Sequence, residues 1–371
     1  LTRASMIELE AAELLVSLID SVDMVKFTKN GSTATSAAVK LARAFTGREL
    51  VARCAQHPFF SFDDWFIGST PITKGIPAET IRQTKQFNFN DIASLEALIQ
   101  AHPEQFACVI LEPAATDCPA VGTSTGCCGQ AICTRNFCGE QPNYLQQVQA
   151  LCKKHGIVFI LDETITGFRW HMKGAQHVHG VQPDLSTFGK AMANGFSVAA
   201  VAGRREIMEL GSIDRIGQER LFLLSTTHGA EMSGLAAFIA TMQFLDKHKV
   251  IPHLWQYGHA LTQLLNRKAQ EHGLSQYFKA AGPAANPYYM TTLADGSASF
   301  ELRTLFAREM IANGVLMPWL AFSYRHGEAE LAQTSQALDI AFAVCSTALR
   351  NGLEDALMNE NIIKPVFRRH N

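Results

Sequence analysis

Asp162 and Lys190 each stand where an apolar run of the sequence ends. Asp162 lies at the end of "GIVFILDE" (156–163), and Lys190 closes "LSTFGK" (185–190). A carboxylate at the end of a buried strand is costly unless a cation or a strong donor meets it. A pyridinium nitrogen would meet that need, and a nearby lysine amine can attack an aldehyde on the same ring. A helix cap or buried ion pair at Asp162, and a surface lysine in a turn at Lys190, are the alternatives.

A glycine- and hydroxyl-rich turn precedes a helical pattern in "TKNGSTATSAAVKLARAF" (28–45). Backbone N–H groups at such a helix start, with Gly31, Ser32 and Thr33, suit a phosphate. An ordinary capped helix is the alternative for this stretch taken alone. Together with Asp162 and Lys190, the turn specifies a cofactor with a phosphate, a basic ring nitrogen and a carbonyl group. That cofactor is pyridoxal 5'-phosphate (PLP).

Short apolar strands must hold these residues at one edge of a sheet. A further run, "FACVILEP" (106–113), carries Glu112 near its end, and the helical pattern "YLQQVQALCKKHG" separates it from the run that carries Asp162. Such alternation predicts an α/β fold with a mostly parallel sheet covered by helices on both faces. Ligands bind beyond the carboxyl ends of the strands in these sheets, so we expect Glu112, Asp162 and Lys190 on the ligand edge.

The pattern becomes helical from about residue 229, with a boundary expected near Lys249. We therefore predict a large domain over residues 1–248 and a smaller C-terminal α/β domain over residues 249–371. The chain begins abruptly at Leu1, and "SMIE" forms a helix-start capping box. We expect a segment upstream of Leu1 to be missing.

Composition favours a partner that is a small molecule. The 371 residues are 47% hydrophobic and 18% charged, with a net charge of -2 and no long run of either sign, so nothing favours nucleic acid or an anionic membrane. No membrane span or secretory signal is visible, and we expect a cytoplasmic protein. Several cysteines cluster between Cys118 and Cys138 in no common zinc spacing. We expect reduced thiols in a loop there, with a structural metal site as the alternative.

Four segments together resemble a known enzyme family. They are "KNGSTATSAAVKLARAFTGRE", "LDETITGFR", "STFGKAMANGF" and "STTHGAEMSGLAA". In this order they are similar to the class III aminotransferases of fold type I, and especially to the glutamate-1-semialdehyde aminomutase branch. "KNGS", "DDWFIG" and "IIKPVFR" look most like branch members linked to sugar or polysaccharide biosynthesis. The resemblance implies PLP as the cofactor and a homodimer with shared active sites.

The resemblance also implies a role for individual residues. Lys190 falls on the Schiff-base lysine and Asp162 on the partner of the pyridine nitrogen. Gly31 and Ser32 fall on the phosphate-binding turn, and Thr227 on a threonine that reaches the phosphate of the neighbouring subunit. Phe59 and Phe60 fall where the family has the aromatic residue that covers the cofactor ring. Phe59 is the expected stacking residue.

Four positions depart from the family pattern. The family usually has an acidic residue at Thr33 and valine at Thr164, on the ring face opposite the aromatic residue. Phe59 and Phe60 replace a tyrosine and a histidine, so a hydroxyl and an imidazole are lost while stacking is kept. Among the weaker candidates we expect Glu163 to support the site through hydrogen bonds, and Glu112 to serve equally well as a structural anchor.

These observations favour a PLP-dependent aminotransferase that moves an amino group from a small-molecule donor to a carbonyl acceptor. An aminomutase that moves the amino group within one molecule needs the same residues, and racemisation is also possible on this scaffold. A catalytically silent paralogue that acts as a binding subunit is the alternative of another class. The segment "GVLMPWLAFSYRHGE" has no carboxylate before Glu328, where the mutase branch has an acidic residue. This difference favours transfer between two molecules.

Overall fold

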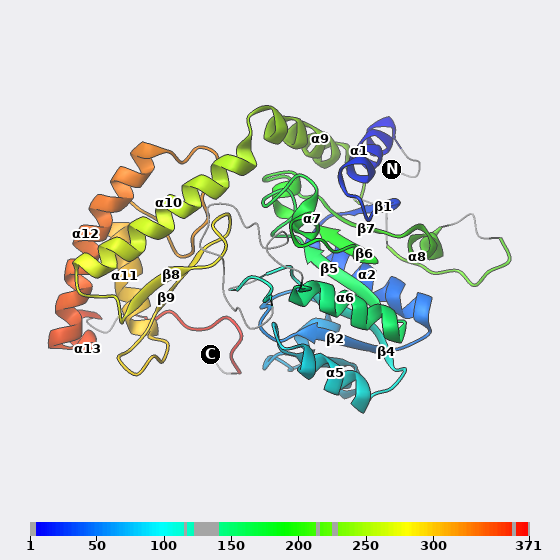
Figure 1. The fold of residues 1–371 in the computed structure, drawn as a ribbon, viewed down its shortest axis with the longest axis horizontal. Helices are drawn as coiled ribbons and strands as arrows, with labels where there is room; N and C mark the ends of the chain where they lie inside the picture. The colour runs from blue at the N-terminus through cyan, green and yellow to red at the C-terminus, as the bar shows by residue number, and fades with distance from the viewer. Residues whose placement is uncertain are drawn as a thin grey trace. The chain divides into compact units, whose positions relative to one another are not determined.

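The computed structural model describes residues 5–114, 117–121, 141–212, 216–224, 229–357 and 361–369. These residues form two compact units (Figure 1). The first runs to Ile251 and also contains Phe367, and the second is Pro252–Val366. The two domains expected at residues 1–248 and 249–371 remain a prediction.

The first unit contains the larger set of elements. They are α1 (Met6–Leu18), β1 (Met24–Thr28), α2 (Gly31–Thr46), β2 (Leu50–Cys54), α3 (Asp64–Ile67), α4 (Ala78–Arg82), β3 (Thr84–Phe87), α5 (Ile92–Ala101), β4 (Phe106–Leu111), α6 (Tyr144–His155), β5 (Val158–Glu163), α7 (Gly174–His179), β6 (Leu185–Phe188), β7 (Ala199–Gly203), α8 (Arg205–Met208) and α9 (Met232–Lys247), with 3-10 turns at Lys190–Met192 and Glu209–Gly211.

Seven strands of this unit form one sheet in the order β1-β7-β6-β5-β4-β2-β3. Strands β6, β5, β4, β2 and β3 pair in parallel, whereas β7 is antiparallel to both β6 and β1. The predicted mostly parallel α/β fold is therefore confirmed. The three runs singled out in the sequence become the adjacent strands β4, β5 and β6, so their carboxyl ends lie side by side.

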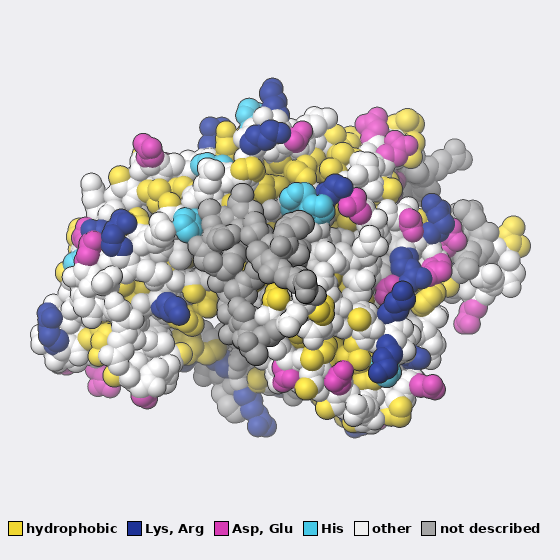
Figure 2. Space-filling model, viewed as in Figure 1, with side chains coloured by type: hydrophobic (Ala, Val, Ile, Leu, Met, Phe, Trp, Pro, Cys, Tyr) yellow, Lys and Arg dark blue, Asp and Glu magenta, His cyan; other side chains and the backbone are white. Residues whose placement is uncertain are grey.

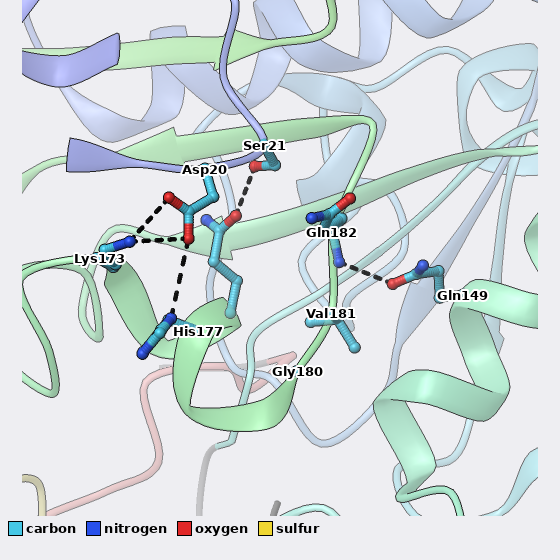
Figure 3. Close-up of a pocket in the computed structure, with 9 residues that line it drawn as sticks. Asp20, Ser21, Gln149, Lys173, His177, Gly180, Val181 and Gln182 are labelled. Carbon is cyan, nitrogen blue, oxygen red and sulfur yellow. Dashed lines mark hydrogen bonds and ion pairs between the residues drawn. The ribbon is translucent and has the colours of Figure 1, made fainter. Parts of the chain in front are cut away.

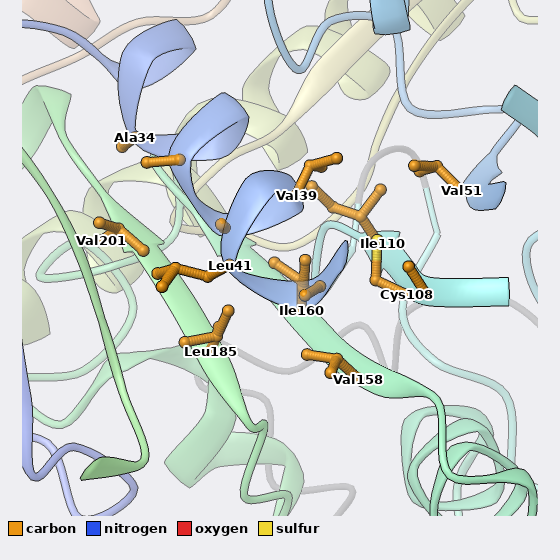
Figure 4. Close-up of a cluster of buried hydrophobic side chains, with 14 of the residues drawn as sticks. Ala34, Val39, Leu41, Val51, Cys108, Ile110, Val158, Ile160, Leu185 and Val201 are labelled. Carbon is orange, nitrogen blue, oxygen red and sulfur yellow. The ribbon is translucent and has the colours of Figure 1, made fainter. Parts of the chain in front are cut away.

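Side-chain alternation divides each strand between two apolar cores. Val158 and Ile160 of β5 pack under α2 (Figure 4), and Phe159 and Leu161 face the opposite core with α5 and α6. Because side chains alternate along a strand, Asp162 continues the face covered by α2. This alternation places Asp162 on the side of the sheet that α2 covers and Glu163 on the opposite side.

The second unit is smaller and built around aromatic side chains. Its elements are most of α10 (Val250–Glu271), β8 (Phe278–Ala281), β9 (Tyr288–Thr291), α11 (Phe300–Ala312), α12 (Glu328–Asn351) and α13 (Leu353–Leu357). β8 and β9 form an antiparallel pair. Phe278 stacks on Tyr289 with ring centroids 5.4 Å apart, and Phe306 stacks on Phe342 at 5.4 Å. The unit is thus a small α/β layer, as predicted for the C-terminal part.

Surface charge is mixed on the face shown in Figure 2, where basic and acidic side chains alternate without a continuous basic patch. Among the helices that the structure describes, none combines the length and hydropathy needed to cross a bilayer.

Candidate active site

A cavity of about 460 Å³ opens where β4, β5 and β6 end. Its lining joins residues from the start of α2, from the loop after β2, and from the ends of the three central strands: Lys29, Asn30, Gly31, Ser32, Phe59, Phe60, Phe62, Glu112, Asp162, Thr164, Ile165, Lys190, Phe196, Ser197 and Val198. The structure therefore brings together seven of the expected site residues, and Glu112 with them. Those seven are Gly31, Ser32, Phe59, Phe60, Asp162, Thr164 and Lys190.

Asp162 is buried at the end of β5 and held by two donors. Its Oδ1 accepts the Thr164 N–H at 3.0 Å and the Thr187 hydroxyl at 2.8 Å. Thr187 lies directly opposite Asp162 in the register between β5 and β6. Burial raises the pKa of Asp162, and the hydrogen bonds from Thr164 and Thr187 and the positive charge of Lys190 oppose that rise. These donors orient the carboxylate and favour its charged form.

Lys190 follows β6 and begins the short 3-10 turn Lys190–Met192. Its backbone φ is +40°, in the left-handed region that a non-glycine residue adopts at some cost. The side chain is exposed at the cavity, and its ammonium group makes no hydrogen bond or ion pair with any described residue. A lysine held in this way is free to bond a molecule in the cavity.

The start of α2 offers two open backbone donors to the same cavity. Asn30 caps the helix by accepting the Thr33 N–H at 2.9 Å and the Thr33 hydroxyl at 3.1 Å. The N–H groups of Gly31 and Ser32 have no acceptor within the described chain, and both residues line the cavity. Open amides at a helix N-terminus fit a phosphate. Thr33 does not join them, because its polar groups are used by Asn30 and it lies outside the cavity lining.

The two adjacent phenylalanines differ sharply in exposure. Phe59 is 48% exposed, whereas Phe60 is 2% exposed and belongs to the core beneath α2. Both rings pack against Phe66 at a centroid distance of 5.7 Å. Of these two rings, therefore, Phe59 alone has an aromatic surface available to cover a ligand ring, while Phe60 supports the cavity wall from the core.

Thr164 occupies the space between the two loops that carry the helix start and Lys190. A Cβ built on Gly31 or on Gly189 would lie 3.1 Å from the γ-methyl of Thr164, closer than ordinary van der Waals contact. Glycine at both positions lets the two loops close around this side chain. Thr164 thus sets the separation between the helix start and Lys190.

Glu163 points to the other face of the sheet and has a supporting role. Its carboxylate accepts the N–H groups of Ala175 and Gln176 at 2.6 and 2.9 Å, the Gln176 side chain at 3.0 Å, and the Thr166 hydroxyl at 3.1 Å. The expected hydrogen-bonding role of Glu163 therefore matches its contacts. It holds the start of α7 against β5.

Several expectations fall outside the described residues. Thr227 is one of them, and so is the cysteine cluster apart from Cys118, which is buried. Sequence reasoning also missed residues that the structure places at the site. Asn30 could have been found as an asparagine directly before the glycine of a helix start, whereas Thr187 is identified only by strand register.

A second cavity, of about 310 Å³, is lined by Asp20 and Ser21 after α1 and by residues of α6, α7 and the segment before β6 (Figure 3). Its charged groups already satisfy one another, since Lys173 contacts Asp20 at 3.0 Å and His177 contacts it at 4.0 Å. Ligand sites in open α/β sheets lie at the carboxyl ends of the strands, so we assign the active site to the cavity that contains Lys190.

Comparison with known proteins agrees with this geometry. The model of the family "Aminotransferase class-III" matches residues 3–282. The chain belongs to the class-III aminotransferases. A 3-aminobutyryl-CoA aminotransferase from Cloacimonas acidaminovorans (strain Evry) is 30% identical over 327 residues, which are 87% of this chain and 72% of the relative.

Solved structures share the fold. The FumI protein of Sphingopyxis sp. MTA144, solved in its PLP internal aldimine form, is 27% identical and has a TM-score of 0.76, covering 95% of this chain and 77% of FumI. An omega-transaminase from Sphaerobacter thermophilus shares the fold at 23% identity, with a TM-score of 0.75 and coverage of 94% and 80%. This class-III aminotransferase is a PLP-dependent enzyme of fold type I.

The residues of this class-III aminotransferase fit the cofactor. Open amides face the cavity at Gly31 and Ser32, and a buried carboxylate is held at Asp162. Lys190 offers an amine that has no partner among the residues that the structure describes. PLP, when bound, supplies an aldehyde carbon that takes up amino groups and a pyridine ring that withdraws electrons. These donors, this carboxylate and this amine match the groups that such chemistry requires.

Proposed function

We propose that this class-III aminotransferase moves an amino group from a small-molecule donor to a separate carbonyl acceptor, in the cavity at the ends of β4, β5 and β6. The observation that carries the proposal is the convergence of Lys190, Asp162 and the open amides of α2 on that one cavity. A catalytically silent binding subunit would not need all three.

Each residue has a defined task in this proposal. Lys190 would hold the cofactor through its amine, and the same amine, once displaced by the amino donor, would carry the proton that leaves the substrate carbon. Asp162 keeps a negative charge opposite the ring nitrogen. Gly31 and Ser32 bind the phosphate through their N–H groups, and Phe59 covers the ring and excludes water from that face.

The 30% identical relative, a 3-aminobutyryl-CoA aminotransferase, supports transfer between two molecules rather than within one. The motifs "KNGS", "DDWFIG" and "IIKPVFR" support an acceptor in sugar- or polysaccharide-related biosynthesis. A cytoplasmic location also remains a prediction, consistent with the buried free thiols of the described residues.

The half-reaction separates the two modes of transfer. PLP-loaded protein mixed with glutamate, without a carbonyl acceptor, is expected to form about one equivalent of 2-oxoglutarate per subunit, because a transaminase releases its first product. The visible absorption of the bound cofactor should change in parallel. If glutamate and other simple amino donors leave the absorption unchanged while glutamate-1-semialdehyde is isomerised, the aminomutase alternative replaces this proposal. If no amino compound reacts, the binding-subunit alternative replaces it.

We further propose that the enzyme is a homodimer whose active sites are shared. The resemblance assigns Thr227 to the phosphate of the neighbouring subunit. In addition, Phe62 and Phe196 are 61% and 57% exposed and line the same cavity, so together they offer an apolar surface beside the site for a partner to cover. Apolar residues around a site that needs a second chain are typical of two-fold dimers.

Sedimentation at falling protein concentration tests this assembly. We expect a dimer with PLP bound, and we expect Phe62→Asp to shift the protein towards monomer because the charge would be buried at the interface. Phe45→Asp is the matched control, since Phe45 is also exposed but lies near the other end of α2. A monomer of the wild-type chain that is fully active would contradict shared sites.

A further inference from the structure

Glu112 is a buried carboxyl group to which the proposed mechanism gives no task. It follows β4 directly, is 5% exposed, and lines the cavity with Asp162 and Lys190. Within the described residues no hydrogen bond or ion pair reaches its carboxyl oxygens. Glu163, at the end of the next strand, accepts four hydrogen bonds. Since buried polar groups are normally paired, a carboxyl left open towards a cavity indicates a group that pairs with a bound molecule.

His57 holds Glu112 in place through the backbone. The Glu112 N–H donates to Nδ1 of His57 at 2.9 Å, and the imidazole is fully buried between Phe60 and Phe89. Burial and the charge of Arg53 lower the pKa of His57 to about 3, so the ring stays neutral. His57 therefore fixes the end of β4 without supplying a positive charge to the Glu112 carboxyl.

The charges that face Glu112 make it an acid rather than an anion. Burial and the negative charge of Asp162 raise the pKa of Glu112 to about 8, and Lys190 only partly opposes the rise. Lys29 also lines the cavity but pairs with Glu231, and burial raises the pKa of the nearby Cys54 thiol to about 12. Thr164 and Thr187 donate hydrogen bonds to Asp162, whereas no described residue donates to the Glu112 carboxyl. When the two carboxyl groups hold one proton between them, the negative charge therefore lies on Asp162 and the proton on Glu112.

We propose that Glu112 contacts the bound molecule as a neutral carboxylic acid whose O–H donates a hydrogen bond to an anionic oxygen, with His57 as its positioning residue. This inference rests on the proposed function, because it takes the cavity to be the PLP site. The acceptor is either the phenolic oxygen of the cofactor or a carboxylate of the amino donor. Both present the same chemistry to Glu112, and the ionised acid would repel both.

The cofactor-free protein tests the protonation state without any activity measurement. A folded carboxylic acid with a raised pKa keeps its proton between the unfolded and folded pKa values, so the wild-type protein should lose stability as pH rises from about 4.5 to about 8. Glu112→Gln has no such proton to lose, so its urea midpoint should fall less than that of the wild type over the same pH range. Glu96→Gln is the matched control, because Glu96 is an exposed carboxylate on α5. Equal pH dependence of the wild type and Glu112→Gln, or failure of Glu112→Gln to fold, would contradict a neutral acid.

Ligand binding identifies the acceptor. If it is the cofactor oxygen, the dissociation constant of PLP should rise about tenfold more in the wild type than in Glu112→Gln between about pH 6 and about pH 9. If it is the donor carboxylate, PLP binding changes equally in both proteins. The dissociation constant of glutamate from the PLP-loaded protein should then rise more with pH in the wild type than in Glu112→Gln. The dissociation constant of propylamine, which has no carboxylate, should change equally in both proteins. The proposal is overturned if the wild type and Glu112→Gln show the same pH-dependent change both in PLP binding and in glutamate binding.

Variants of His57 test the positioning role. His57→Asn keeps an acceptor for the Glu112 N–H and should retain the pH-dependent difference, whereas His57→Leu should lose it. Failure of the wild type to bind PLP at any pH contradicts the proposed function, while the stability measurement still reports on Glu112.

Discussion

Lys190→Ala is expected to lose the covalent attachment of PLP and to reduce transamination by roughly four orders of magnitude, since it removes both the bonding amine and the proton carrier. The amides of Gly31 and Ser32 remain, so the variant should still bind PLP reversibly. The measurement is borohydride reduction of the PLP-loaded protein followed by peptide mapping.

Lys29 provides the matched control for this experiment, because it is the other lysine in the described lining of the cavity. The amine of Lys29 forms an ion pair with Glu231, whereas the amine of Lys190 has no partner among the described residues. Lys29→Ala should therefore still take the reduced label on Lys190. Label on Lys29, or on any other lysine of the wild type, would overturn the assignment.

Asp162→Asn is expected to lower turnover by several orders of magnitude while part of the PLP binding remains. Asparagine keeps the shape and can still accept from Thr187, but it has no charge to keep the ring nitrogen protonated. The loss should appear in the turnover number more than in the dissociation constant of PLP, measured by absorbance titration.

Two comparisons make the Asp162 result specific. Thr187→Val removes one donor to the carboxylate and should cost far less than the loss of the charge itself. A PLP analogue methylated on its ring nitrogen carries a permanent positive charge, so it should restore part of the turnover of Asp162→Asn. Near-normal turnover of Asp162→Asn with ordinary PLP would refute the role of Asp162.

The strand ends could be predicted from the sequence because their signal is local. An apolar run followed by a polar residue identifies Asp162 and Glu112 without knowledge of the rest of the fold. The partner of Asp162 could not be found in this way, because Thr187 meets it only through the register of β5 against β6. Register depends on how the whole sheet assembles.

The helix start and the aromatic pair show the same limit. In the sequence, the turn formed by Gly31, Ser32 and Thr33 suits a phosphate as a whole, but the cap made by Asn30 uses the N–H and the hydroxyl of Thr33. Phe59 and Phe60 are identical in type, and only packing against the core beneath α2 makes one ring exposed and the other buried. Tertiary packing, rather than residue type, decides which of these side chains face the cavity.

The contact of Thr164 with Gly31 and Gly189 determines where this enzyme can be re-engineered for new substrates. A side chain larger than threonine at position 164 would push the phosphate turn away from the lysine loop, so directed evolution for bulky amines should meet cofactor loss there. Shortening the exposed rings of Phe59, Phe62 and Phe196 leaves no buried void within the subunit, but it would remove the proposed cover of the cofactor ring or part of the proposed dimer interface. Libraries that keep threonine or valine at position 164 therefore have the larger share of functional variants.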